Sequence, residues 1–285
     1  MPELRHVRHV EDESVRHLVD LGYVDPEDVA AHAAELRHQS QAELKRAMEL
    51  NSQGRGQEAA ALLEIISGDD PDWVPPHQRL AEIYYSAGRC DNAQAELDWL
   101  AHHGVEHPRL ALIAGGLALG RRDFSAALEE LQYARHVEPN LPSVHTLLGT
   151  VLLRLRRWDE AEDAFREAAQ QNPNDARARD GMAAVCLQHG EYEDAADWAL
   201  RALEQDMQLF RAHYHLGLAL AQLNRPEEAV QALGASSRID RTRTAPYYRL
   251  SQIARHRLND PAGAERYREH AREIIRQRRA QRGRQ

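Results

Sequence analysis

Apolar and polar positions alternate along this chain with a helical period. After residue 40, apolar side chains recur at spacings of three and four, as in Leu148, Leu152 and Leu155. Such spacings place the apolar side chains on one face of an amphipathic helix. Short polar segments with Gly, Asn or Asp separate the helical segments, as at residues 189–194. The pattern predicts an all-α protein built from helix–turn–helix hairpins.

The hairpins repeat every 34 residues. One series at this spacing contains only tiny residues: Ala59, Ala93, Ala127, Ala161, Ala195, Ala229 and Gly263. A second series contains only small ones: Ala47, Ala81, Gly115, Gly149, Ala183, Gly217 and Ser251. Small side chains are expected where two helices cross closely. Seven units without insertion or deletion follow, with starts near residues 40, 74, 108, 142, 176, 210 and 244. One hairpin cannot bury its own apolar face, whereas stacked hairpins can, so the period predicts an α-solenoid.

A 34-residue hairpin with small residues at its eighth and twentieth positions resembles the tetratricopeptide repeat family. The fourth unit carries most of the family pattern in Leu148, Gly149, Leu152, Trp158, Ala161, Phe165, Ala168 and Pro173. The resemblance covers residues 40–277 and implies a right-handed solenoid of seven units. We therefore expect an N-terminal helical extension or cap at 1–39, the repeats at 40–277 and a basic tail at 278–285.

The first 39 residues follow another pattern. A short helix at 15–21 is expected to end at Gly22, and Asp25-Pro26 is a typical helix start. Four apolar side chains nearby are free to cap the first unit: Leu18, Leu21, Tyr23 and Val24. The segments LVDLGYV and DPED at 18–28 resemble the junction between the catalytic domain and the repeat tail of sulfatase or type I phosphodiesterase proteins of the alkaline phosphatase superfamily.

Composition excludes several classes of protein. The 285 residues are 42% apolar and 28% charged, and no apolar run reaches the roughly 18 residues of a membrane span. The N-terminus lacks the apolar core of a secretory signal, and the two cysteines suggest no disulfide framework. We therefore expect a cytoplasmic protein. A net charge of −9 argues against nucleic acid as the partner.

Catalytic and metal-binding patterns were sought and not found. The 16 histidines form no zinc-type spacing, and His77, His145 and His213 share the fourth position of their units, which predicts a structural role. Cys90 and Cys186 occupy positions that are bulky and apolar in other units, so both are expected to pack. No phosphate-binding loop occurs. We expect no metal, no cofactor and no enzymatic activity.

The candidate binding site follows from the resemblance, which implies that the first helix of each unit lines a concave groove. In units three to five the expected groove residues are Leu112, Gly116, Leu119, Thr146, Thr150, Leu153, Ala184 and Leu187. Units six and seven add Arg211, Tyr214, Tyr248, Arg249, Gln252 and Arg255. The centre is apolar and the C-terminal end is cationic and aromatic, a composition typical of interaction surfaces.

These features predict a non-catalytic scaffold that binds a peptide or protein segment with apolar anchors and an acidic flank. Two alternatives stay open. The chain is a regulatory or targeting module of a phosphodiesterase- or sulfatase-type hydrolase whose catalytic domain is absent here, or it is a solenoid that self-assembles into a homo-oligomer.

Overall fold

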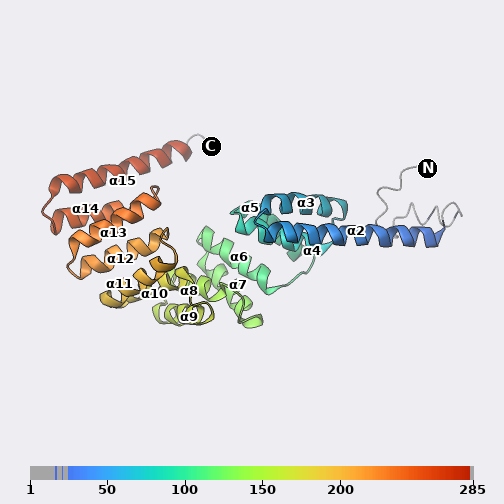
Figure 1. The fold of residues 1–285 in the computed structure, drawn as a ribbon, viewed down its shortest axis with the longest axis horizontal. Coiled ribbons are helices and arrows are strands. Elements are labelled where there is room, and N and C mark those ends of the chain that lie inside the picture. Colours follow the sequence, from blue (N-terminus) through green and yellow to red (C-terminus); the bar gives the residue numbers. More distant parts are fainter. Residues whose placement is uncertain (1–16, 18–20, 22–24, 283–285) are drawn as a thin grey trace. The chain divides into compact units, whose positions relative to one another are not determined.

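The computed structural model describes residues 17, 21 and 25–282, with the backbone alone described for residues 26–37. All regular structure within these residues is helical, which confirms the predicted all-α class. Fourteen described helices fall into two compact units, Met1–Arg121 and Arg122–Gln285 (Figure 1). The first unit holds α2 (Pro26–Ser52), α3 (Gly56–Asp69), α4 (Val74–Ser86), α5 (Cys90–His102) and α6 (Pro108–Arg121). The second unit holds α7 (Phe124–Val137), α8 (Val144–Arg154), α9 (Trp158–Gln171), α10 (Ala176–His189), α11 (Tyr192–Gln205), α12 (Phe210–Gln222), α13 (Pro226–Ile239), α14 (Ala245–His256) and α15 (Pro261–Arg282).

The first unit begins with an unusually long helix. α2 starts at Pro26, as the Asp25-Pro26 pair predicts, and continues without a break through residue 40, where the first repeat was expected to start. The N-terminal extension and the first repeat therefore share one helix. Of the four apolar residues expected to cap this unit, Leu21 is 55% exposed, and Leu18, Tyr23 and Val24 lie outside the described residues.

The second unit is a stack of helical hairpins. The pairs α8–α9, α10–α11, α12–α13 and α14–α15 each pack together, and every pair contacts the next (Figure 1). The first helices of these pairs also contact one another in succession, from α8 to α10, α12 and α14. The core lies between the layers and is filled by small or branched side chains, including Leu148, Ala161, Phe165, Ala199 and Leu233. This arrangement is the helix-turn-helix stacking that the 34-residue period predicts.

Glycines in the first helices allow side chains of the second helices to approach the backbone. A Cβ atom added at Gly149 would lie 2.7–2.8 Å from three ring atoms of Phe165, and one at Gly181 would meet the same ring. A Cβ atom at Gly217 would lie 2.6 Å from Cγ of Leu233. Such distances are far below van der Waals contact. The small residues of the period are therefore required by close helix crossings, as expected.

The turn inside each hairpin contains one residue with positive φ at the same place in the repeat. In six units these residues follow one another every 34 positions: Gly54, Gly88, Arg122, Arg156, Gly190 and Asn224. After most of them the next backbone N–H donates to a carbonyl five residues earlier, as in Arg157 N to Leu152 O at 2.9 Å. This bond is that of a Schellman C-cap. The turn thus requires a left-handed residue even where the side chain is arginine.

The division between the two units falls inside the third predicted repeat. Its first helix, α6, packs on α4 and α5 through Leu110, Ile113 and Leu117, which belong to the core of the first unit. Its second helix, α7, packs on α8 in the second unit. The seven-unit division remains a prediction from the period, and each compact unit is described by itself below.

The repeated histidines join successive repeats. Nε2 of His77, His145 and His213 lies 3.2, 3.0 and 3.1 Å from the carbonyl oxygen six residues earlier, in Pro71, Pro139 and Met207. A ring nitrogen that faces a carbonyl oxygen acts as the donor, so each histidine holds the start of a first helix to the end of the preceding repeat. The structural role predicted for these three residues is confirmed.

Candidate functional site

The predicted groove residues are divided between the two units. Leu112, Gly116 and Leu119 lie on α6 in the first unit, and the other eleven lie on α8, α10, α12 and α14 in the second. Gly116 lies directly under Tyr85 of α4, where a Cβ atom would overlap the phenol ring. The site is therefore built below from the second unit, whose helices are mutually packed.

Two threonines of the expected groove are engaged in internal hydrogen bonds. Thr146 is buried, and its hydroxyl donates to Oδ2 of Asp175 at 2.6 Å. Oδ1 of Asp175 accepts from the backbone N–H groups of Arg177 and Ala178, which caps the N-terminus of α10. The hydroxyl of Thr150 donates to the carbonyl oxygen of Thr146 at 2.8 Å. These threonines thus connect α8 to the next first helix and stabilise its cap.

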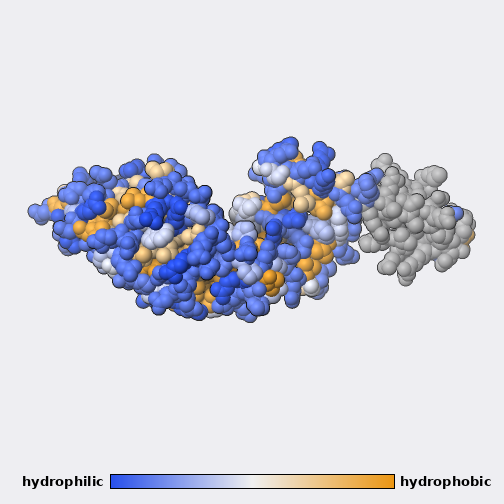
Figure 2. Space-filling view, turned by 60° about the horizontal axis from the view of Figure 1, so that its bottom comes forward, coloured by the Kyte–Doolittle hydropathy of each residue, from blue (hydrophilic) through white to orange (hydrophobic). Residues whose placement is uncertain are grey.

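Apolar side chains of the expected groove are half-buried. Leu153, Ala184, Leu187 and Tyr214 each retain part of their surface, and Leu187 packs beside the buried cluster around Cys186. We call the side of α8, α10 and α12 that carries Thr150 and these four residues the first-helix face. In the view of Figure 2, the second unit is mostly hydrophilic and shows hydrophobic patches of limited size. Small apolar anchors, not a broad apolar floor, are what this unit presents in that view.

The most buried charge of the second unit belongs to Asp180 of α10, which is 2% exposed. Its Oδ1 lies 2.6 Å from Nδ1 of His215, and its Oδ2 lies 3.3 Å from Nε of Arg211, both on α12. Burial alone would raise the pKa of Asp180, but the charge and hydrogen bond of His215 and the charge of Arg211 lower it overall. An ionised carboxylate therefore orients Arg211, a predicted groove residue, from beneath.

Arginines gather beside this carboxylate. Arg154 ends α8, and its pKa is lowered by desolvation and by the positive charges of Arg211, Arg122 and Arg243. The guanidinium of Arg243 lies 5.1 Å from the centroid of the Phe210 ring, and its Nε lies 2.9 Å from Oδ2 of Asp240. We call Arg122, Arg154, Arg211 and Arg243 the arginine cluster. Sequence reasoning found only Arg211, because the other three stand at different positions of their repeats.

The last predicted groove residues are solvent-exposed on α14. Tyr248 is 44% exposed, and Arg249 donates to Oε1 of Gln252 at 3.1 Å. Arg255 is also exposed. None of the three polar residues is held by a partner from another helix among the described residues, so this part of the predicted site has no fixed geometry.

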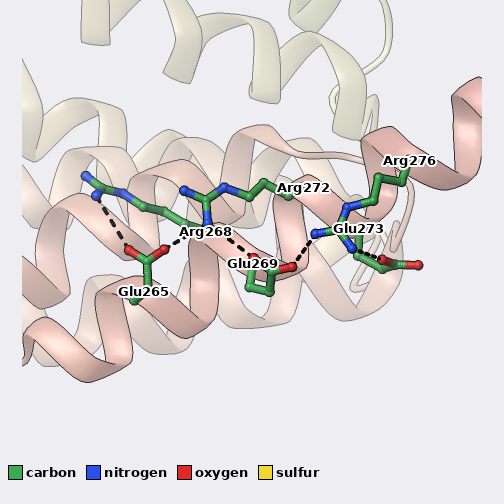
Figure 3. A network of polar contacts seen from close by, with 6 residues as sticks. All are labelled: Glu265, Arg268, Glu269, Arg272, Glu273 and Arg276. Carbon is green, nitrogen blue, oxygen red and sulfur yellow. Dashed lines mark hydrogen bonds and ion pairs between the residues drawn. The ribbon is translucent and has the colours of Figure 1, made fainter.

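The arginines of α15 are paired, unlike those of the cluster. Carboxylates and guanidinium groups alternate along the helix and bond to one another at spacings of three and seven (Figure 3): Glu265, Arg268, Glu269, Arg272, Glu273 and Arg276. Hydrogen bonds from Arg272 and Arg276 lower the pKa of Glu269. Arg278, in the predicted basic tail, donates to the carbonyl oxygen of Thr242. Each positive charge here has an oxygen acceptor on the chain itself.

The two cysteines differ in environment. Cys186 is 5% exposed, and burial, followed by the nearby Glu191, raises the pKa of its thiol to about 12. The prediction that it packs in the core is confirmed. The same prediction for Cys90 was wrong, because Cys90 is the first residue of α5 and is exposed. The larger side chains at that position in other units reach the neighbouring helix, and a cysteine does not.

Metal ligands and membrane spans were also examined. No group of three His, Cys, Asp or Glu side chains suited to hold a metal ion occurs in the part of the chain that the structure describes. Within the same residues, no helix combines the length and the apolar character needed to cross a bilayer.

Comparison with known proteins identifies the architecture. Models of the tetratricopeptide repeat match residues 79–142, 146–209 and 210–243, more than half of the chain. The chain belongs to the tetratricopeptide repeat family. The resemblance noted in the sequence is therefore confirmed at the level of the family.

Individual relatives of this tetratricopeptide repeat protein are distant. It is 26% identical over 134 residues to a peroxisomal targeting signal receptor of Candida albicans, which is 47% of this chain and 21% of the receptor. It is 26% identical over 176 residues to a TPR repeat-containing protein of Treponema pallidum, which is 61% of this chain and 22% of that protein. The chain thus spans about a fifth of the length of these curated relatives.

A solved structure shares the fold. The hetero-tetramer Cut9–Hcn1 of the APC/C contains a chain that superposes with a TM-score of 0.65 at 17% identity, over 75% of this chain and 42% of that one. At this identity the likeness supports the fold alone.

Proposed function

We propose that this tetratricopeptide repeat protein is a non-catalytic scaffold that binds a peptide segment of a protein partner on the first-helix face. The observation that carries the proposal is the convergence of half-buried apolar side chains with oriented arginines on adjacent first helices. Apolar anchors and arginine are enriched at the energetic centres of protein interfaces. A relative that is named as a receptor for a targeting signal supports recognition of a short segment.

The test uses a partner that is cross-linked to the protein in its native host and then purified. Isothermal titration should show weaker binding to a variant with Leu153→Asp and Ala184→Glu, because charge is introduced between the apolar anchors. Leu200→Asp is the matched control, since Leu200 lies on the second helix α11 and is 49% exposed. Circular dichroism would verify that both variants fold. Equal affinity of the partner for the first-helix variant and the control would refute the proposal.

Three narrower predictions stand beside this proposal. The association with a phosphodiesterase- or sulfatase-type hydrolase rests on residues 18–28 alone, most of which lie outside the described residues; co-purification with such an enzyme would test it. Self-assembly predicts a mass that rises with concentration in light scattering. The cytoplasmic location predicts that the protein fractionates with cytoplasmic markers.

A further inference from the structure

The arginine cluster concentrates positive charge in a chain whose net charge is −9. Arg122 stands in the turn before α7 with a φ of 67°, and Arg154 is the last residue of α8. Arg211 is the second residue of α12, and Arg243 precedes α14 by two positions. The four side chains come from four separate segments of one compact unit. Their guanidinium groups are close enough for the other three to act electrostatically on Arg154.

The carboxylates beside the cluster do not neutralise it. Asp180 is shared between His215 and Arg211, and Asp240 pairs with Arg243. Among the described residues, neither Arg122 nor Arg154 has an acidic side chain within ion-pair distance. Two guanidinium groups are therefore left without an internal counter-charge. This is the reverse of α15, where each arginine in the ladder meets a carboxylate.

Unlike surface lysines, these arginines are partly held in place. Asp180 fixes Arg211 from the buried side, and the Phe210 ring and Asp240 fix Arg243. Guanidinium groups bind carboxylates through paired, nearly parallel hydrogen bonds, and prior orientation reduces the entropy lost on binding. An oriented cluster with surplus charge is thus suited to an anion that brings several oxygen acceptors.

We propose that Arg122, Arg154, Arg211 and Arg243 form a receptor for the carboxylates of an acidic segment in the partner protein. The inference rests on the proposed function and adds the chemistry of the segment: glutamate or aspartate side chains at the cluster, next to apolar side chains on the first-helix face. Charge complementarity favours a peptide over nucleic acid. The cluster is confined between Asp180 and Asp240, whereas a nucleic acid requires a basic surface along its backbone.

The binding test uses fluorescein-labelled octaglutamate, a carboxylate-bearing peptide without further sequence information, and measures its fluorescence anisotropy. Octaserine of equal length and an oligothymidylate of equal charge are the comparison probes. Octaglutamate should bind, and its affinity should fall as salt is raised. The double variant Arg122→Gln/Arg154→Gln should bind it about tenfold more weakly or worse. The double variant Arg135→Gln/Arg238→Gln removes the same charge from exposed positions on α7 and α13 and should bind as the unchanged protein does.

A second measurement does not depend on the probe. Because Arg154 is surrounded by like charges, Arg154→Gln should raise the midpoint of thermal unfolding at low salt, and the gain should shrink as salt screens the repulsion. Arg238→Gln should show no such gain. A salt-independent loss of stability in Arg154→Gln would overturn the view that the cluster is a repulsive arrangement awaiting an anion.

The outcomes separate the two proposals. Tighter binding of oligothymidylate than of octaglutamate, or equal binding of octaglutamate by both double variants, overturns the carboxylate receptor. If the cross-linked partner then still requires the apolar residues of the first-helix face, the scaffold function stands without it. Loss of partner binding in Arg122→Gln/Arg154→Gln, but not in Arg135→Gln/Arg238→Gln, supports both.

Discussion

Replacing Gly149 by alanine tests the packing of the second unit, since two effects of known sign oppose each other there. Alanine is the better helix former by about 1 kcal/mol, and Gly149 lies in the middle of α8. The added Cβ atom, however, would lie 2.7–2.8 Å from the Phe165 ring. The ring cannot retreat, because Gly181 of α10 confines it on its other side. Overpacking of this kind costs about 1–3 kcal/mol. We therefore expect a net loss of about 1–2 kcal/mol in the free energy of unfolding.

The same substitution at Gly234 should have the opposite sign. Gly234 lies inside α13, and the nearest atom to an added Cβ is the flexible end of Arg238 at 3.4 Å. Only the helix propensity then changes, so Gly234→Ala should gain up to about 1 kcal/mol. The two variants have identical chemistry and lie in one compact unit. Their difference of about 2–3 kcal/mol isolates the cost of the close crossing.

Urea unfolding followed by circular dichroism would measure both variants, with the midpoint and slope compared to those of the unchanged protein. Phe165→Leu supplies a further check. The smaller side chain leaves room for a methyl group, so adding Gly149→Ala to Phe165→Leu should cost less than adding it to the unchanged protein. If Gly149→Ala stabilises the protein as much as Gly234→Ala does, the helices do not cross as closely as described and the reasoning is refuted.

Three further substitutions or measurements address turns, charges and thiols. Arg156 has a φ of 60° and Gly190 a φ of 82°, so Arg156→Gly should stabilise and Gly190→Ala should destabilise by about 1 kcal/mol in urea unfolding; equal signs would contradict this. Because the pKa of Asp180 is lower in the folded chain, its carboxylate contributes stability above its ordinary value of 3.8 and loses it as the pH falls through that region. Asp180→Asn should thus cost about 2 kcal/mol at neutral pH and reduce the further loss below about pH 4, and an unchanged pH profile would argue against an ionised Asp180. A thiol reagent should titrate Cys90 at once and Cys186 only after unfolding, and two rapidly reacting thiols in the native protein would contradict the burial of Cys186.

The repeat could be predicted from the sequence because the fold applies the same steric demand every 34 residues. Ala161 and Gly149 are small because a helix crosses each of them, and His145 recurs because a carbonyl oxygen lies at the same place in each repeat. A demand that recurs leaves a periodic signal. Features without such recurrence left none, including the division of the chain at Arg122 and the uninterrupted course of α2 through residue 40.

The left-handed turn shows where a periodic demand is hidden by composition. Gly54, Gly88, Gly190 and Asn224 are residues that adopt a positive φ readily, and glycine does so without steric cost. Arg122 and Arg156 carry the same conformation without that signal. A turn can accept one unfavourable residue when the helices on both sides are firmly packed, so the conformation follows from the hairpin and not from the residue.

The period also separates side chains that the fold requires from those that it leaves free. Arg154 stands at the thirteenth position of its unit, where the other units carry Ser52, Ser86, Gly120, Gln188, Gln222 and His256. Side chains so different cannot all satisfy one packing demand, so the hairpin does not require arginine there. An arginine that packing does not require, that has no acidic partner among the described residues and that is repelled by three others lowers stability. Its presence is explained if binding of an anion offsets that loss, and for this reason Arg154 is the residue on which the carboxylate receptor is best tested.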